Sequence, residues 1–232
     1  MESYYDFDHD KFAQLCSKED FWGQIRRTVN GRPVDDIQIR MITEVITRQL
    51  QLNAQDNIID LCCGNGALSN SYLYKTRKIL GIDGSKHLIK IANQFFQKNC
   101  KLDFVCGDAL DVLKSIRNPD QFTKVLCYGS FSYFDDALAK SILGKLSKDF
   151  SNVSIIFLGN LPDIKKSTEF FTRKMPPLSD LKLHTTSIGV WRSEEQIFDL
   201  CVKSGWNAHF SRMPDDFYGS HFRFDCTLTR NN

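Results

Sequence analysis

An acidic residue followed by a glycine-rich turn, at residues 57–69, is the stretch of this sequence best suited to chemistry. The apolar run at residues 58–61 is typical of a buried strand. Gly64 and Gly66 follow it; because they lack a Cβ, they can adopt positive φ and let a ligand approach the backbone. Helix-forming residues come next. This strand–loop–helix order would present free N–H groups and a helix N-terminus to whatever binds there.

Asp60 lies inside the expected strand end, and its charge indicates which ligands would be accepted. A carboxylate repels a pyrophosphate, whereas it attracts an ammonium or sulfonium group. The loop therefore favours a cationic ligand. A tight strand-to-helix turn with no ligand stays open as the alternative for the loop alone.

Two further acids follow later apolar runs. The run at residues 78–82 ends in Asp83, about 20 residues beyond the glycine loop, where a carboxylate can accept hydrogen bonds from both hydroxyls of a ribose. The run at residues 102–106 leads into Asp108, at a strand end of the kind where ligands of open α/β sheets collect. Asp83 has the alternative role of a turn residue, and Asp108 that of a helix N-cap.

The elements that would position these acids alternate along the chain. Apolar strand-like runs alternate with helical patterns of roughly 10–15 residues, which predicts a parallel sheet with right-handed crossovers. A capping box at residues 193–196 opens a helix that ends near Gly205. The last two strands, residues 207–213 and 222–228, are joined by a loop of about eight residues, so we expect them to pair antiparallel. The expected fold class is α/β: a doubly wound, mostly parallel seven-stranded sheet, Rossmann-like, with an antiparallel C-terminal strand pair.

The domain organisation expected from the sequence is an N-terminal tail and lid, residues 1–33, followed by one domain over residues 34–232. Residues 1–15 lack clear periodicity and suggest a loose tail or lid. Trp22, Arg26 and Arg27 are costly to bury without partners, so their segment either closes over a ligand or caps a sheet edge. Residues 160–192 form an irregular insertion on the substrate side, of a length that is usually functional or mobile.

Composition excludes several classes of protein. The 232 residues are 42% apolar and 25% charged, which suits a soluble globular domain, and a net charge of +2 is too weak to indicate nucleic acid. No window approaches the roughly 20 apolar residues that span a bilayer, and the N-terminus does not resemble a secretory signal. The eight cysteines form no zinc pattern and suit free thiols in a reducing compartment, so we expect a cytoplasmic protein without a metal.

With these residues laid out, the chain resembles the class I S-adenosylmethionine-dependent methyltransferases over roughly residues 34–230. Residues 60–66 are similar to the acidic-glycine motif of that family, with Cys62 where a glycine is common. The resemblance implies S-adenosyl-L-methionine as the cofactor. It also implies a set of cofactor-binding residues: Asp60, Cys62, Gly64, Asn65, Gly66, Asp83, Gly84, Asp108, Ala109 and Cys127.

Two other functions stay open. A nicotinamide-dependent oxidoreductase also carries a glycine loop followed by an acid, but its fingerprint has a third glycine where this chain has Ser69. A methyltransferase-like binding module without turnover is the second alternative. Cofactor affinity separates the first from a methyltransferase, and methyl transfer to any acceptor would exclude the second.

The reaction implied by the resemblance is methyl transfer to a small-molecule acceptor. We expect O-methylation of a hydroxyl, on a sugar, a glycan precursor or another metabolite, by a monomer or homodimer without a nucleic-acid partner. A hydroxyl acceptor needs a base. The candidates are His184 in the insertion, His221 in the final loop and Asp163 after the fifth strand, with Tyr133 lining the acceptor site.

Overall fold

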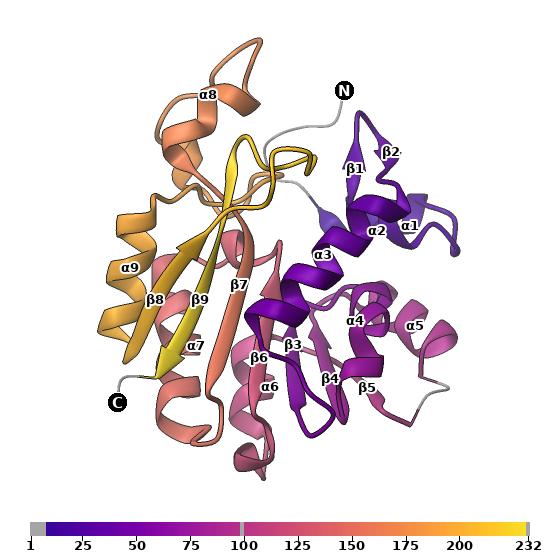
Figure 1. The fold of residues 1–232 in the computed structure, drawn as a ribbon. Coiled ribbons are helices and arrows are strands. Elements are labelled where there is room, and N and C mark those ends of the chain that lie inside the picture. The colour runs from indigo at the N-terminus through magenta and orange to yellow at the C-terminus, as the bar shows by residue number, and fades with distance from the viewer. Residues whose placement is uncertain (1–7, 98–99, 231–232) are drawn as a thin grey trace.

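The computed structural model describes residues 8–97 and 100–230. A seven-stranded sheet of order β5-β4-β3-β6-β7-β9-β8 forms its centre (Figure 1). The strands are β3 (Asn57–Leu61), β4 (Lys78–Asp83), β5 (Leu102–Cys106), β6 (Lys124–Tyr128), β7 (Ile155–Pro162), β8 (Trp206–Ser211) and β9 (Arg223–Arg230). Strands β3 to β7 are parallel, whereas β9 runs antiparallel to both β7 and β8. The predicted fold class is confirmed.

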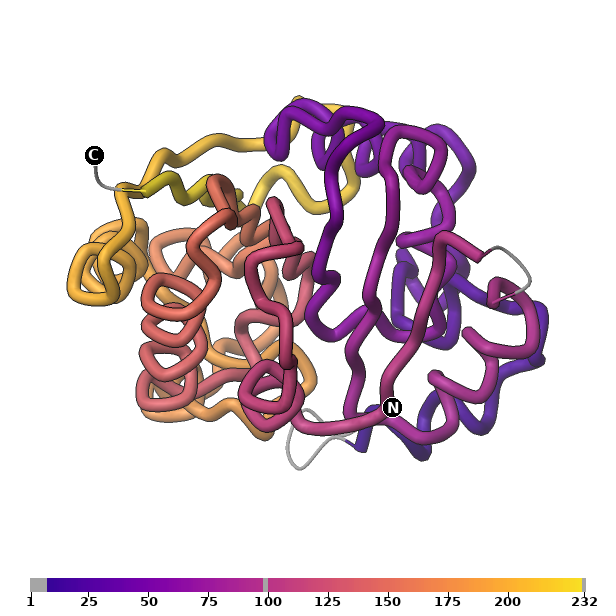
Figure 2. Tube along the Cα trace, turned by 90° about the horizontal axis from the view of Figure 1, so that it is seen from below, coloured from indigo at the N-terminus to yellow at the C-terminus, as the bar shows by residue number. Residues whose placement is uncertain are grey.

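Helices cover both faces of this sheet (Figures 1 and 2). One face carries α3 (Asp36–Gln49), α4 (Ala67–Tyr72) and α5 (Lys86–Phe95), and the other carries α6 (Ala109–Ser115), α7 (Asp136–Asp149) and α9 (Glu194–Lys203). Short 3₁₀ turns join them: η1 (Leu73–Lys75), η2 (Pro119–Gln121) and η3 (Phe131–Tyr133). The side chains of Ser85, Asp135 and Ser193 cap the helices that follow them, and the cap at Ser193 is the capping box that the sequence predicted.

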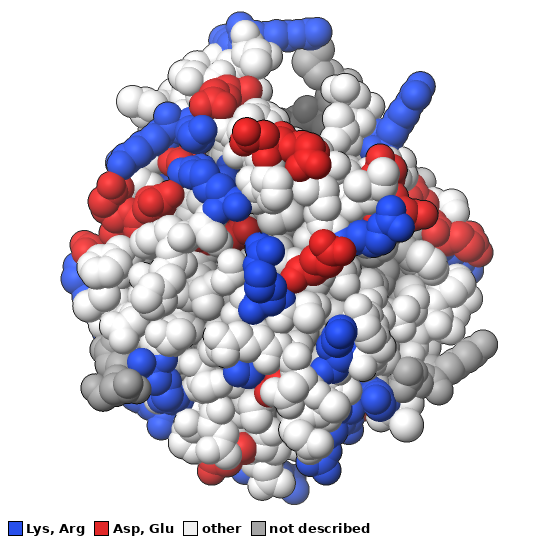
Figure 3. Space-filling model, in the orientation of Figure 1, with Lys and Arg blue, Asp and Glu red and all other residues white. Residues whose placement is uncertain are grey.

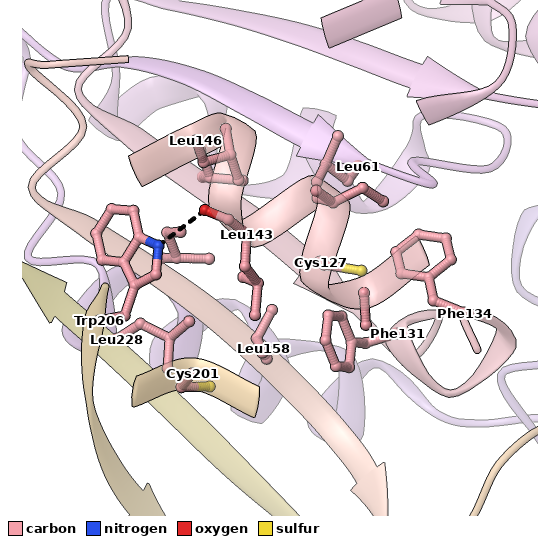
Figure 4. Close-up of a cluster of buried hydrophobic side chains, with 14 of the residues drawn as sticks. Leu61, Cys127, Phe131, Phe134, Leu143, Leu146, Leu158, Cys201, Trp206 and Leu228 are labelled. Atoms are coloured by element: carbon pink, nitrogen blue, oxygen red, sulfur yellow. Dashed lines mark hydrogen bonds between the residues drawn. The ribbon is translucent and has the colours of Figure 1, made fainter. Parts of the chain in front are cut away.

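Each face of the sheet has its own core, because successive strand residues point to opposite sides. Ile58 belongs to the core under α3, α4 and α5, and its neighbour Ile59 to the core under α6, α7 and α9. The second core contains Trp206, whose Nε1 donates a 3.0 Å hydrogen bond to the Leu143 carbonyl (Figure 4). Both residues are fully or nearly fully buried, so this bond satisfies an indole that would otherwise be stranded.

Residues 8–31, called here the N-terminal cap, pack against the edge of the domain near α5. They comprise α1 (His9–Leu15), α2 (Phe21–Gln24) and β1 (Thr28–Val29), which pairs with β2 (Arg32–Pro33). The expectation of a loose tail is wrong for residues 9–15, which form a helix capped by the side chain of Asp8. The rest of that expectation concerns residues outside the described part of the chain.

Residues 160–192 are irregular, as predicted, but they are anchored to the domain. They contain η4 (Ile164–Lys166), α8 (Ser167–Phe170) and η5 (Asp180–Lys182). Leu181, Trp191 and Phe222 form a small buried cluster between the insertion and the start of β9. The insertion is therefore held by packing against the C-terminal strand.

The sheet order creates a crevice between β3 and β6. From β3 the chain proceeds outward to β4 and β5, and it then returns to β6 and continues to β7 on the other side. The loops at the carboxyl ends of β3 and β6 therefore diverge. Ligands of open α/β sheets bind at such a switch point.

Candidate active site

A cavity of about 1170 Å³ opens at this switch point. Its walls come from the N-terminal cap, the glycine loop after β3, the ends of β4 and β6, residue Asn160 of β7, and the loop that leads into β9. Typical small-molecule sites measure roughly 300–1,000 Å³. The cavity can therefore hold a nucleoside-sized ligand and a second small molecule together.

The glycine loop forms the floor of the cavity in a conformation that favours glycine. Cys62, Gly64 and Gly66 all have positive φ, at 58°, 60° and 76°. A Cβ on Gly64 would lie 2.7 Å from Cγ2 of Ile25, because the N-terminal cap packs directly against the loop. A Cβ on Gly66 would lie 2.5 Å from the ring of Phe104. The missing side chain of Gly64 thus lets the N-terminal cap pack at the cavity wall, whereas that of Gly66 leaves room for the ring of Phe104 in the core.

Asp83, at the end of β4, faces this loop. Its Oδ2 accepts a 2.8 Å hydrogen bond from the backbone N–H of Gly64, and its Oδ1 accepts one of 2.8 Å from that of Ser85. Burial raises the pKa of Asp83, and the two N–H donors oppose that rise. The carboxylate lines the cavity and is held rigidly with its remaining lone pairs available.

Asp60 lies deeper in the same wall and is only 3% exposed. Its Oδ2 accepts hydrogen bonds from the Ser69 hydroxyl, at 2.6 Å, and from the Tyr72 hydroxyl, at 2.9 Å. Burial raises the pKa of Asp60 to about 6, although these two donors pull it down. At neutral pH the residue is a buried anion that would gain from a cationic ligand.

Asn65 fastens the N-terminal cap to the glycine loop. Its Nδ2 donates to the carbonyl of Phe21, at 2.7 Å, and to Oε1 of Gln24, at 2.8 Å. The side chain is fully buried and does not line the cavity. Asn65 therefore supports the site by closing the cap over it.

A second part of the cavity wall is basic and aromatic. Arg27 donates from Nη2 to the carbonyl of Tyr128 at 3.0 Å, and its guanidinium lies 4.6 Å from that ring centroid. Arg223 donates from Nη1 to the carbonyl of Asn160 at 2.5 Å. Asn160 has φ of 65° at a register shift in β7, a bulge that turns it toward the cavity. The Tyr133 hydroxyl donates to the carbonyl of Ser187 at 2.9 Å.

The comparisons with known proteins agree with this geometry. A family described as "Methyltransferase domain" matches residues 58–148, which include the glycine loop, Asp60 and Asp83. An uncharacterized methyltransferase of Schizosaccharomyces pombe is 32% identical over 76 residues, or 33% of this chain and 27% of that protein. A ubiquinone biosynthesis O-methyltransferase of Pelagibacter ubique is 25% identical over 171 residues, or 69% of this chain and 67% of that protein.

Solved structures share the complete architecture. Magnesium protoporphyrin IX methyltransferase from Synechocystis, solved with bound SAH, is 16% identical with a TM-score of 0.63 over 96% of this chain and 98% of that one. An S-adenosylmethionine-dependent methyltransferase from Clostridium acetobutylicum is 15% identical with a TM-score of 0.62 over 97% and 99%. Residues 58–148 thus match the methyltransferase domain, and the fold of the chain is that of the class I methyltransferases.

The chain covers only part of several relatives. The matched regions span less than half the length of three of them, at 27%, 40% and 49%. A small RNA methyltransferase of the same fold, with a TM-score of 0.62, is matched over 27% of its chain. The relatives are named for different acceptors, so the family does not identify the acceptor of this protein.

The residues of the methyltransferase site fit S-adenosylmethionine, the cofactor of this family. Asp60 and Asp83 both line the cavity, and neither has a lysine or arginine within ion-pair distance in the described residues. Two unpaired carboxylates suit a sulfonium and a ribose diol, and they would repel a pyrophosphate. Ser69, which stands in place of the third glycine of a dinucleotide fingerprint, donates to Asp60 instead.

Several predicted cofactor residues lie away from the cavity. Asp108 is exposed, and its Oδ1 accepts from the backbone N–H of Leu110 at 2.9 Å, so the alternative role of N-cap is the one observed. Ala109 is buried in the first turn of the same helix. Cys127 packs with its side chain inside the core cluster of Figure 4. Cys62 and Gly84, by contrast, line the cavity.

The three candidate bases are separated in space. His221 is exposed, lines the cavity and has its ring 4.7 Å from that of Phe222. His184 is exposed and outside the cavity. Asp163 is buried outside the cavity, where it caps η4 and forms an ion pair with Arg212, with 2.6 Å between Oδ2 and Nη2. The structure thus brings only His221, of these three, to the site.

Sequence reasoning missed Asn160, Arg223, His9 and Asp10, which all line the cavity. Only Arg223 carried a usable signal, because it stands between two phenylalanines. Within the described residues, no cluster of three or more His, Cys, Asp or Glu is arranged to hold a metal ion. Nor does that part of the chain contain a helix of the length and apolarity needed to cross a membrane.

Proposed function

We propose that this chain binds S-adenosylmethionine against Asp60 and Asp83 and transfers a methyl group to a hydroxyl of a small molecule bound on the basic, aromatic wall. The observation that carries the proposal is the division of one cavity into an acidic wall at the glycine loop and a basic, aromatic wall at Tyr128 and Arg27. Such a division suits a cationic donor facing a different acceptor.

The donor would be held by groups that are already in place. Asp83 would accept hydrogen bonds from ribose hydroxyls, and the backbone around Gly64 would allow close approach. Asp60 would provide a negative charge near the sulfonium. The bound cofactor supplies an activated methyl group, so the protein mainly has to align the acceptor, which can lower a barrier by about 7–11 kcal/mol.

Other residues would exclude water from the cavity and accept the proton of the acceptor. The N-terminal cap covers the cavity and is held there by the hydrogen bonds of Asn65 to Phe21 and Gln24. His221 lines the cavity and would take the proton of an acceptor hydroxyl through a ring nitrogen. A well-placed base contributes roughly 10²–10⁴-fold to the rate.

A small acceptor is favoured over a nucleic acid by the surface charge. On the face drawn in Figure 3, Lys and Arg are interspersed with Asp and Glu, without a continuous basic stripe. Proteins that track a nucleic-acid backbone present such a stripe with interleaved aromatic side chains. A sugar, a glycan precursor or another hydroxyl-bearing metabolite would enter the cavity without one.

The experiment measures binding and turnover on the purified full chain. Calorimetry should detect binding of S-adenosylmethionine and no binding of NADH. A hydroxyl-bearing small molecule from a metabolite panel should stimulate the formation of S-adenosylhomocysteine. Total RNA in the same assay should give no stimulation. Binding of NADH instead would favour an oxidoreductase, and donor binding with no turnover on any acceptor would favour a binding module.

The base is tested with His221→Ala and with His184→Ala as the matched control, since both histidines are exposed and only His221 lines the cavity. His221→Ala should lower kcat at saturating acceptor by roughly 10²–10⁴-fold. His184→Ala should leave kcat unchanged. If both variants behave like the wild type, histidine base catalysis is wrong.

A further inference from the structure

Two arginines in the cavity wall have no carboxylate partner. Among the described residues, neither Arg27 nor Arg223 forms an ion pair, although ten such pairs occur elsewhere. Arg27 is only 7% exposed, and its Nε has no hydrogen-bond acceptor. Buried guanidinium groups are normally paired, because taking such a charge out of water is costly.

Both guanidinium groups are held in fixed positions. That of Arg27 stacks on Tyr128 and donates to the carbonyl of the same residue. It also lies against Gly129, where an added Cβ would be 2.9 Å from Nη1. That of Arg223 lies 4.7 Å from the ring centroid of Phe222 and donates to Asn160. Stacked, hydrogen-bonded arginines lose little further entropy when they bind an anion.

The two positive charges act on the same region of the cavity. Burial lowers the pKa of Arg223, and repulsion by Arg27 lowers it further. Both arginines also oppose the rise that burial causes in the pKa of the Tyr133 hydroxyl. The nearby carboxylate of Asp225 is bonded to the Asn160 N–H at 2.6 Å and does not line the cavity. Arg223 opposes the rise that burial causes in the pKa of Asp225, and Arg27 does the same for Asp60, but neither arginine forms an ion pair within the described residues. Both guanidinium groups can therefore still donate to a ligand.

We propose that Arg27 and Arg223 bind an anionic group, a carboxylate or a phosphate, on the methyl acceptor, so that the acceptor is a small organic acid. The inference rests on the proposed function, because it assigns this wall to the acceptor. Tyr128, Tyr133 and Phe222 line the same wall and suit a ring or other apolar body beside the anion. The acidic wall at Asp60 would repel the anion, which orients the acceptor in one direction.

The test uses three probes that share a ring and differ in charge: benzoate, phenyl phosphate and neutral benzyl alcohol. Each is titrated by calorimetry into the full chain, with and without S-adenosylhomocysteine. At least one anion should bind more tightly than benzyl alcohol, and the tighter anion identifies carboxylate or phosphate. Equal binding of all three probes would overturn the proposal.

Substitution of the two arginines tests whether the anion binds to them. Arg27→Gln and Arg223→Gln should each weaken anion binding by about tenfold or more, the size expected for a lost charge-assisted hydrogen bond. Arg32→Gln is the matched control, because Arg32 is exposed, outside the cavity and only five residues from Arg27; it should bind like the wild type. Anion binding unchanged in both cavity variants would contradict the assignment.

Two further measurements distinguish loss of the anion site from misfolding and from loss of donor binding. If Arg27→Gln does not fold by circular dichroism, Arg27→Lys keeps the charge and should retain weaker anion binding, because an ammonium cannot reproduce the stacked fork. S-adenosylmethionine affinity is measured on every variant and should stay within about twofold of the wild type in Arg223→Gln. A wild type that binds anions but not the donor would refute the proposed function and leave this anion site standing.

Discussion

Asp83 accepts a 2.8 Å hydrogen bond from the backbone N–H of Gly64, which joins the end of β4 to the loop that follows β3. The two strands are parallel neighbours, and the second oxygen of Asp83 is fixed by the N–H of Ser85. The acid therefore shapes the glycine loop before any ligand arrives. Under the proposed function, loop conformation and donor binding would be coupled through this one side chain.

Gly64→Ala should disturb the loop more than Gly84→Ala does. Gly64 has φ of 60° and its added Cβ would lie 2.7 Å from Ile25, whereas a Cβ on Gly84 would meet nothing within 4 Å. We expect Gly64→Ala to lower the free energy of unfolding by about 1–3 kcal/mol, and Gly84→Ala to change it by less than about 0.5 kcal/mol. Urea denaturation of both variants measures this, and equal effects would contradict the conformational role of Gly64.

Asn65→Ala should release the N-terminal cap. It removes the two hydrogen bonds to Phe21 and Gln24 and leaves buried acceptors unsatisfied, at a cost of about 1–3 kcal/mol. Hydrogen exchange in residues 9–24 should become faster. Asn57→Ala is the control, because its Nδ2 makes a similar bond to the Gln121 carbonyl on the exposed surface, far from the cap. Unchanged exchange in Asn65→Ala would mean that packing alone holds the cap.

The affinity for S-adenosylmethionine should fall on acidification through pH 6. Asp60 has a pKa of about 6 in the folded protein, so protonation below that value removes the negative charge beside the sulfonium. We expect about a tenfold loss of affinity between pH 7 and pH 5. S-adenosylhomocysteine, whose sulfur is uncharged, should lose less.

Two variants check that pH dependence. Asp60→Asn should abolish the difference between the two ligands. Asp225→Asn is the control, because burial also raises the pKa of Asp225 to about 6, yet that residue lies outside the cavity. In Asp225→Asn, S-adenosylmethionine should still lose more affinity on acidification than S-adenosylhomocysteine does. If the two ligands lose affinity equally in the wild type, or if the two variants behave alike, the titrating group lies elsewhere.

The same two acids make the fold less stable as pH rises. Their folded pKa values of about 6 lie above the ordinary value of 3.8, so their stabilising contribution is complete below pH 4 and is lost as pH rises through 6. Urea unfolding between pH 4 and 7 should show this, with a decrease of about 1–3 kcal/mol for each acid. Asp60→Asn and Asp225→Asn should each remove one contribution. A flat profile in the wild type would contradict the raised pKa values.

Local sequence patterns were sufficient for the central sheet. The apolar run at residues 102–106 coincides with β5, and Ser193 opens α9 with the predicted capping box. Strand alternation and capping are determined by neighbouring residues, so one sequence reveals them. Asp60, Gly64 and Asp83 were expected near the ends of their strands from the same local patterns, and all three line the cavity.

The basic wall and the cap depend on contacts between distant residues. Arg27 reaches Tyr128 across 101 positions, and Arg223 reaches Asn160 across 63. The bulge that turns Asn160 toward the cavity leaves no local pattern, since it arises from the pairing of β7 with β9. For Asp108 the sequence left both a ligand contact and an N-cap role open; the residue caps α6 and lies outside the cavity lining.

The most direct measurement is a calorimetric titration of the wild type and of Asp83→Ala with S-adenosylmethionine. The wild type should bind the donor. Asp83→Ala should bind it more weakly by about 1–3 kcal/mol, because ribose hydroxyls would lose their acceptor and the loop its anchor. A wild type that shows no binding, or a variant that binds as tightly as the wild type, would contradict the account.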